Sequence, residues 1–359
     1  YGAAGSTLGT VMGSLAGLLF VLFVLWLYRG GIRRQLKHDR TKRVESYSSL
    51  LKALLFTAIP IVFSTAIYNI NQIIDLTIFN HIMSSQGYVE QEYMALQGIY
   101  TGKYDTLINV PMAIANALGA SVVPSLTAAV ANGTKQQVND KINQTLRLTM
   151  LIAIPSCVGY FVLASPIMVL LYNDDSATPA QLLMMGSIVV VLYGLSSVSN
   201  SILHGLNRMT APAKNAGISL VVHLAAFCIM MTVFRMNVYA LVGGNIVFSL
   251  CMCILNQIKI RKVSGYRIDV IHTFVKPFIA AAVMGIVTFG VHSLLALVIG
   301  GRFIPAVLSI LVAMAVYIVA VLRLGTLSEE DIKDLPMGVR LLKYCKKLHL
   351  LPEAKAEAE

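Results

Sequence analysis

The chain has 359 residues, of which 57% are hydrophobic and only 13% are charged, and its mean hydropathy is +0.73. A soluble fold of this length would lack polar surface at such a composition, so a soluble globular domain is excluded. The net charge of +11 comes from 28 Lys and Arg against 17 Asp and Glu. These charges lie mostly between apolar segments, a pattern that a membrane explains without any nucleic-acid partner.

Nine segments are long and apolar enough to cross a bilayer as helices of about 20 residues. They cover residues 8–28, 54–79, 107–130, 148–172, 182–204, 216–234, 240–258, 278–299 and 304–322. The predicted fold class is therefore an all-α polytopic membrane protein with nine transmembrane helices, and no soluble domain is left over.

Basic residues are concentrated in every second loop. Segments 29–52, 135–147, 208–214, 259–276 and 323–355 hold all Lys and Arg except Lys103, Arg235 and Arg302. The positive-inside rule places the basic loops in the cytoplasm. We therefore expect a plasma-membrane protein with its Tyr1 end outside the cell and its C-terminus inside.

The chain begins with Tyr1 and has no signal-peptide n-region, so we expect that it starts partway through a longer protein. If that protein starts in the cytoplasm, an odd number of spans precedes Tyr1. The five cysteines lie in predicted spans or in the inner tail, which predicts neither a disulfide framework nor a metal site.

Three motifs resemble one known group of transporters. They are NVPMAIANALGASVVPSL at 109–126, IPSCVGYFVLASPIMVLLY at 154–172 and HGLNRMTAPAK at 204–214. Together they resemble the seventh-to-tenth-helix region of the multidrug/oligosaccharidyl-lipid/polysaccharide exporter superfamily. The most similar branch is that of stage V sporulation protein B-like and polysaccharide-biosynthesis flippases, which are related to lipid II flippases.

The resemblance implies a fourteen-helix fold with two lobes around a central cavity, in which these nine spans are helices 6–14. It implies the last helix of the N-terminal lobe at 1–28 and a basic cytoplasmic linker between the lobes at 29–53. The C-terminal six-helix lobe is then at 54–258, a cytoplasmic loop at 259–277 and two extra helices at 278–322. The tail at 323–359 is expected to be a basic amphipathic helix on the inner leaflet.

Polar side chains recur at helical spacing inside the second, third and fifth predicted spans, so they share one face of each helix. Polar groups are costly in hydrocarbon and normally face the bundle interior or a water-filled cavity. The alternative is that they only hydrogen-bond helix to helix. The candidates for a substrate cavity are Asn69, Gln72, Asp105, Asn109, Asn116, Asn200 and His204.

Three further residues are candidates for ion coupling. Asp75 is the only carboxylate well within an apolar span, although water near the outer end could solvate it. His223, in the middle of the sixth span, could bind substrate, carry protons or only be hydrogen-bonded. The resemblance implies sodium ligands in the sixth and seventh spans, which this chain does not clearly match: the sixth span has His223 where a carboxamide or carboxylate is expected, and Asn245 is the candidate in the seventh span. No cofactor is predicted, and coupling to sodium, to protons or to the membrane potential stays open.

One position departs from the lipid II flippases. Those proteins carry an arginine directly after the aspartate that matches Asp105, and Thr106 stands there in this chain. That arginine would pair with the pyrophosphate of the lipid carrier. Its absence disfavours lipid II itself, although Lys103 is near.

The predicted function is a flippase that moves an undecaprenyl-diphosphate-linked oligosaccharide outward across the bacterial inner membrane by alternating access. Its partners would be that lipid-linked sugar, membrane lipids and enzymes of cell-wall or polysaccharide synthesis. The alternative is a multidrug or small-molecule cation antiporter of the same superfamily, which would need acidic and aromatic cavity walls. A membrane-embedded enzyme acting on lipid-linked sugars ranks third, because the longest outer loop, 80–104, is short and has no convincing catalytic residues.

Overall fold

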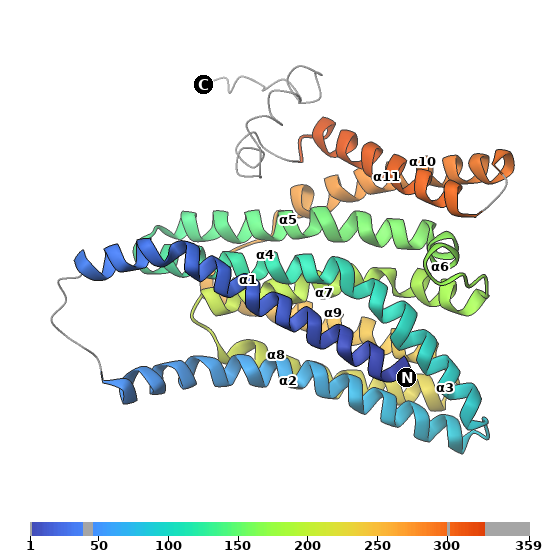
Figure 1. The fold of residues 1–359 in the computed structure, drawn as a ribbon, viewed down its shortest axis with the longest axis horizontal. Coiled ribbons are helices and arrows are strands. Elements are labelled where there is room, and N and C mark those ends of the chain that lie inside the picture. Colours follow the sequence, from blue (N-terminus) through green and yellow to red (C-terminus); the bar gives the residue numbers. More distant parts are fainter. Residues whose placement is uncertain (1, 39–45, 300–301, 327–359) are drawn as a thin grey trace. The chain divides into compact units, whose positions relative to one another are not determined.

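A computed structural model of the protein describes residues 2–38, 46–299 and 302–326 as a succession of helices (Figure 1). No strand occurs within these ranges, so the predicted all-α fold class is confirmed. The chain divides into two compact units, Tyr1–Phe56 and Thr57–Glu359.

The first unit contains α1 (Gly2–His38) and the first part of α2 (Tyr47–Ser85). The segment Val11–Lys37 of α1 is apolar enough to cross a membrane. Because α1 continues to His38, the first residues of the predicted linker 29–53 are helical, and residues 39–45 of that linker lie outside the described ranges.

The second unit contains the rest of α2 and all later elements, with two short π-helical segments, η1 and η2. The elements are α3 (Glu90–Ile99), η1 (Tyr100–Asp105), α4 (Thr106–Asn132), α5 (Lys135–Val162), α6 (Ala164–Tyr172), α7 (Ala177–Gly205), α8 (Thr210–Thr232), α9 (Tyr239–Ser264), η2 (Ile271–Val275), α10 (Lys276–Val298) and α11 (Phe303–Arg323).

Helix α7 is the centre of this unit, since it packs against α4, α5 and α9. Its glycines permit close approach, as membrane helices require. A methyl group at Gly205 would lie 2.8 Å from a Leu126 side-chain carbon of α4, and one at Gly186 would collide with the ring of Tyr104. Helix α8 packs on α9, while α10 and α11 pair with each other and α10 packs on α5 (Figure 1).

Eight helical segments of the described chain are long and apolar enough to span a membrane. Eight of the nine predicted spans overlap them. The remaining predicted span, 54–79, lies inside α2, which is not among the eight, so the count of nine is not confirmed.

Segment 80–104, predicted as the longest outer loop, is mostly helical. Helix α2 continues to Ser85, α3 begins at Glu90, and α3, η1 and α4 follow one another without a break. Glu90 and Glu92 lie in the first turn of α3, where negative charge is favourable. The charged and polar residues that lower the hydropathy of this stretch are therefore accommodated in a helix.

The predicted span 148–172 is two helices instead of one. Helix α5 ends at Val162 and α6 begins at Ala164. Pro166 explains the break, because its ring would clash with the carbonyl of Val162 in a continuous helix. By contrast, Pro111, Pro124 and Pro155 are accommodated inside α4 and α5. The predicted tail at 323–359 lies outside the described residues beyond Thr326, and the predicted domain boundaries stay a prediction.

Candidate functional site

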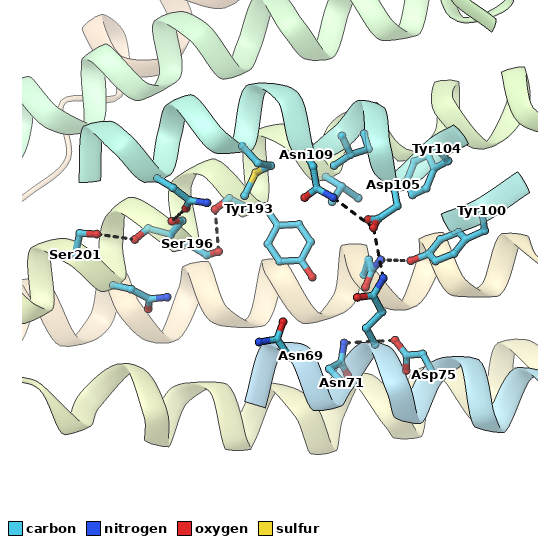
Figure 2. A pocket seen from close by; sticks show the side chains of 18 of the residues that line it. Asn69, Asn71, Asp75, Tyr100, Tyr104, Asp105, Asn109, Tyr193, Ser196 and Ser201 are labelled. Atoms are coloured by element: carbon cyan, nitrogen blue, oxygen red, sulfur yellow. Dashed lines mark hydrogen bonds between the residues drawn. The ribbon is translucent and has the colours of Figure 1, made fainter. Parts of the chain in front are cut away.

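A cavity of about 630 Å³ lies among α2, η1, α4, α7 and α9 of the second unit (Figure 2). All seven residues predicted for a substrate cavity line it: Asn69 and Gln72 from α2, Asp105 from η1, Asn109 and Asn116 from α4, and Asn200 and His204 from α7. The structure thus brings these side chains together, and their binding of a substrate stays a prediction.

The carboxylates of the cavity wall give it an acidic character. Two carboxylates line it, those of Asp75 and Asp105, and neither Lys nor Arg is among its described lining residues. The carboxylate of Asp105 accepts hydrogen bonds from two amides, at 3.4 Å from Gln72 Nε2 and 3.3 Å from Asn109 Nδ2 (Figure 2). Amides can solvate this carboxylate but cannot neutralise it.

Amides also link the helices at another part of the wall. Asn256 Nδ2 donates to Asn200 Oδ1 at 2.8 Å, and Asn215 Nδ2 donates to Asn256 Oδ1 at 2.8 Å. Asn256 is fully buried. We call Asn200, Asn256 and Asn215 the amide chain, which joins α7, α9 and α8. On α4, Asn116 Oδ1 accepts from the hydroxyl of Ser197 of α7.

Asp75 and His223, predicted separately as ion-coupling candidates, form one buried pair. His223 Nε2 lies 2.7 Å from Asp75 Oδ1, and His223 Nδ1 lies 2.7 Å from the backbone oxygen of Gly244. Asn71 Nδ2 donates to the other Asp75 oxygen at 3.3 Å. The side chain of His223 is fully buried, whereas that of Asp75 is 5% exposed and lines the cavity.

The third ion-coupling candidate, Asn245, also lines the cavity, but it contacts a different group. Its Nδ2 donates to the hydroxyl of Tyr100 at 2.6 Å. Among the described residues, no group of three or more His, Cys, Asp and Glu side chains could hold a metal ion.

The sequence prediction missed two tyrosines and one amide of this site. Tyr100 and Tyr104 line the cavity from η1, where a loop was predicted. Asn71 is offset from the polar face of Asn69 and Gln72, yet its side chain reaches Asp75 one turn later. The spacing of four residues between Asn71 and Asp75 was the available signal.

Lys103, considered near a phosphate site in the sequence prediction, is not among the cavity-lining residues. Its ammonium group forms an ion pair with Asp174, in the turn between α6 and α7, and lies 5.8 Å from the centre of the Tyr172 ring. The hydrogen bond from Lys103 is the main cause that lowers the pKa of Asp174 to about 2, and hydrogen bonds from Ser176 add to it.

Comparisons with known proteins agree with this architecture. A scan against protein-family models matches residues 1–308 to the family described as lipid II flippase MurJ. Among curated proteins, the chain is 26% identical to lipid II flippase MurJ of Bacillus subtilis (strain 168) over 92% of this chain and 62% of that protein. It is 22% identical to stage V sporulation protein B of the same organism, over 95% of this chain and 65% of that protein.

Among solved structures, lipid II flippase MurJ in an inward closed conformation matches with a TM-score of 0.52 and 17% identity, over 84% of this chain and 59% of that one. This structural similarity supports the all-helical fold described above. The chain spans less than two thirds of the length of the curated relatives named above. The predicted resemblance to the exporter superfamily is confirmed, and the chain belongs to the lipid II flippase MurJ family.

Proposed function

We propose that this member of the lipid II flippase MurJ family takes part in flipping a lipid-linked sugar precursor of the cell wall or of a polysaccharide across the bacterial inner membrane by alternating access. The observation that carries the proposal is the cavity wall, where five asparagines and a glutamine from α2, α4 and α7 face one space together with serine hydroxyls.

Amide-rich walls suit sugars because each carboxamide offers both donors and acceptors, and a sugar has many hydroxyls of modest hydrogen-bonding strength. The diphosphate of such a substrate needs cations, and the described cavity wall has neither Lys nor Arg. Those cations would come from parts of the protein outside this wall. Enzymes that make or use the same precursor would be its functional partners.

The proposal can be tested by reconstituting the protein, expressed from its complete gene, into vesicles with a labelled undecaprenyl-diphosphate sugar. We expect flipping at a rate about tenfold lower in the Asn69→Ala/Asn109→Ala variant, because two sugar-facing amides are lost. Asn132→Ala is the matched control, since Asn132 is exposed at the end of α4 and does not line the cavity. Equal rates in all three proteins would contradict the proposal.

A second candidate function has its own observation. The same cavity is lined by Asp75 and Asp105 together with Tyr100, Tyr104 and Tyr193, and it has neither Lys nor Arg among its described lining residues. Carboxylates and aromatic faces bind organic cations. Vesicles that export a cationic dye but never move a polyprenyl-diphosphate sugar would establish this cation antiporter in place of the flippase.

We also propose that the Tyr1 end of the chain faces the cell exterior and the C-terminus the cytoplasm, from the charge asymmetry of the loops. Cysteines placed at the exposed positions Ser84 and Ser176 should react with an impermeant thiol reagent added to intact cells. Cysteines at Thr134 and Thr210, also exposed, should not react until the cells are opened. The reverse pattern would overturn the orientation.

A further inference from the structure

The buried pair of Asp75 and His223 has hydrogen-bond partners that fix how many protons it holds. The partner of His223 Nδ1 is the backbone oxygen of Gly244, which can only accept, so Nδ1 must carry a proton. The partner of Nε2 is a carboxylate oxygen of Asp75 at 2.7 Å. Two bare lone pairs cannot share that distance, so a second proton lies between them.

Both ways of placing that second proton give the same charge. Either an imidazolium faces a carboxylate, or a neutral imidazole faces a carboxylic acid. In each case the pair is neutral overall, with one proton more than a neutral histidine beside an ionised aspartate. Removing that proton would leave a net negative charge at a site where His223 is fully buried and the Asp75 side chain is 5% exposed, which is costly.

The surroundings hold the histidine in this position. The ring of Phe227 stacks on the imidazole at an interplanar angle of 4°, and Phe248 meets it edge-on at 85°, each with ring centres 5.9 Å apart. A methyl group at Gly244 would lie 2.7 Å from His223 Cε1. The absence of a side chain at Gly244 therefore lets the imidazole reach the backbone of α9.

Apart from His204 of α7, the other ionisable groups that line the cavity with Asp75 cannot supply a positive charge. The same cavity is lined by three tyrosines and one further carboxylic acid, namely Tyr100, Tyr104 and Asp105 of η1 and Tyr193 of α7. The amides beside the pair, Asn71 and Asn245, are neutral. The Asp75 side chain opens to this cavity, whereas His223 is enclosed. A proton therefore has a route to the pair through the water-accessible side of Asp75.

We propose that Asp75 and His223 form a proton-binding site, and that the bound proton holds α2 against α8 by completing the hydrogen bond between these two side chains. Just beyond the end of α2, Gln86 Nε2 also donates to the backbone oxygen of Met231 of α8 at 2.9 Å. Without the proton, the lone pair of Nε2 faces a carboxylate and the contact becomes repulsive. The use of this site to drive transport rests on the function proposed above, whereas the binding of the proton does not.

A proton fits these ligands better than sodium does. An alkali cation prefers a shell of oxygen ligands. Here the Gly244 oxygen already accepts from the imidazole, and a nitrogen occupies the position facing Asp75.

The test measures thermal unfolding of the purified protein, expressed from its complete gene, between about pH 6 and about pH 9. Losing the proton leaves a buried negative charge in the folded state only, so the melting temperature should fall by about 5 °C as the pH rises and the pair releases this proton. In Asp75→Asn the amide can donate to Nε2 of a neutral His223, which imitates the protonated pair, so this part of the pH dependence should disappear. Asp105→Asn is the matched control, because it removes the other cavity carboxylate and should keep the fall.

A flat profile for the unmodified protein, or an equal fall in Asp75→Asn, would overturn the proposal. So would recovery of the melting temperature at high pH by sodium chloride but not by choline chloride, which would assign the site to a metal cation. If Asp75→Asn does not fold, nuclear magnetic resonance of nitrogen-labelled histidine decides, since the proposal requires a protonated Nδ1 on His223 at neutral pH. Loss of sugar flipping with this pH behaviour intact would remove the proposed function and leave the proton site standing.

Discussion

Helices α8 and α9 are joined by polar contacts in two regions that differ in kind. In one, His223 of α8 meets Gly244 of α9 and Asp75 of α2; in the other, the amide chain joins Asn215, Asn256 and Asn200. Between them lies an apolar cluster of Ala216, Phe248 and Met252. The first region depends on a proton for its hydrogen bonds, whereas carboxamides keep the same donors and acceptors at every physiological pH.

The contact between Asp75 and His223 can therefore change with protonation, whereas the amide chain cannot. A change of protonation at Asp75 alters how α2 meets α8, while the amide chain keeps α7, α8 and α9 together. Alternating access requires both properties, since one part of a lobe must move against another part that stays intact. Substitutions in each region can show whether the two contacts are independent.

The largest loss of stability is expected from Gly244→Ala. The added methyl group would lie 2.7 Å from Cε1 of His223, whose ring is held between Phe227 and Phe248 and cannot withdraw. We expect a loss of about 2–3 kcal/mol in the free energy of unfolding, from overpacking and a weakened hydrogen bond. Chemical denaturation in detergent measures it.

Gly243→Ala is the control for this substitution. Its methyl group would approach the sulfur of Met230 at 2.7 Å, and a methionine side chain can move aside at little cost. Equal losses in the two variants would show that α9 tolerates no side chain at either position, and the special role of Gly244 would be lost.

A smaller effect is expected from Asn256→Ala. The substitution removes the side chain shared by Asn200 and Asn215 and also the bond to the Ser196 carbonyl at 3.3 Å. Hydrogen bonds between membrane helices contribute modestly, so we expect a loss of about 1–2 kcal/mol in the free energy of unfolding. This loss should be the same at about pH 6 and about pH 9, because no member of the amide chain titrates. A loss that changes with pH would show that the two regions are coupled.

The sequence predicted which residues meet at the cavity but not how they pair. An amide within an apolar span has to leave the lipid, so helical spacing alone placed Asn109 and Asn116 on the side that the structure turns to the cavity. The pairing of Asp75 with His223 joins positions 148 residues apart, and helical period contains no information about contacts of that kind. Tyr100 was missed because charged neighbours lowered the hydropathy of a segment that is helical.

The smallest effect is expected at the ion pair of Lys103 and Asp174, far from both regions in the sequence. The pKa of Asp174 is lowered to about 2, chiefly by the hydrogen bond from Lys103. A carboxyl whose pKa is lower in the folded state stabilises the protein above its unfolded pKa of about 3.8, and that contribution disappears as the pH falls toward 2. Lys103→Gln should therefore reduce the melting temperature slightly at neutral pH and remove part of the decline in melting temperature between about pH 4 and about pH 2.

Arg302→Gln is the control, since the ion pair of Arg302 with Asp175 at 3.0 Å is exposed and should contribute almost nothing to stability. If both variants kept the full acid decline, the Lys103 pair would be as weak as the exposed one.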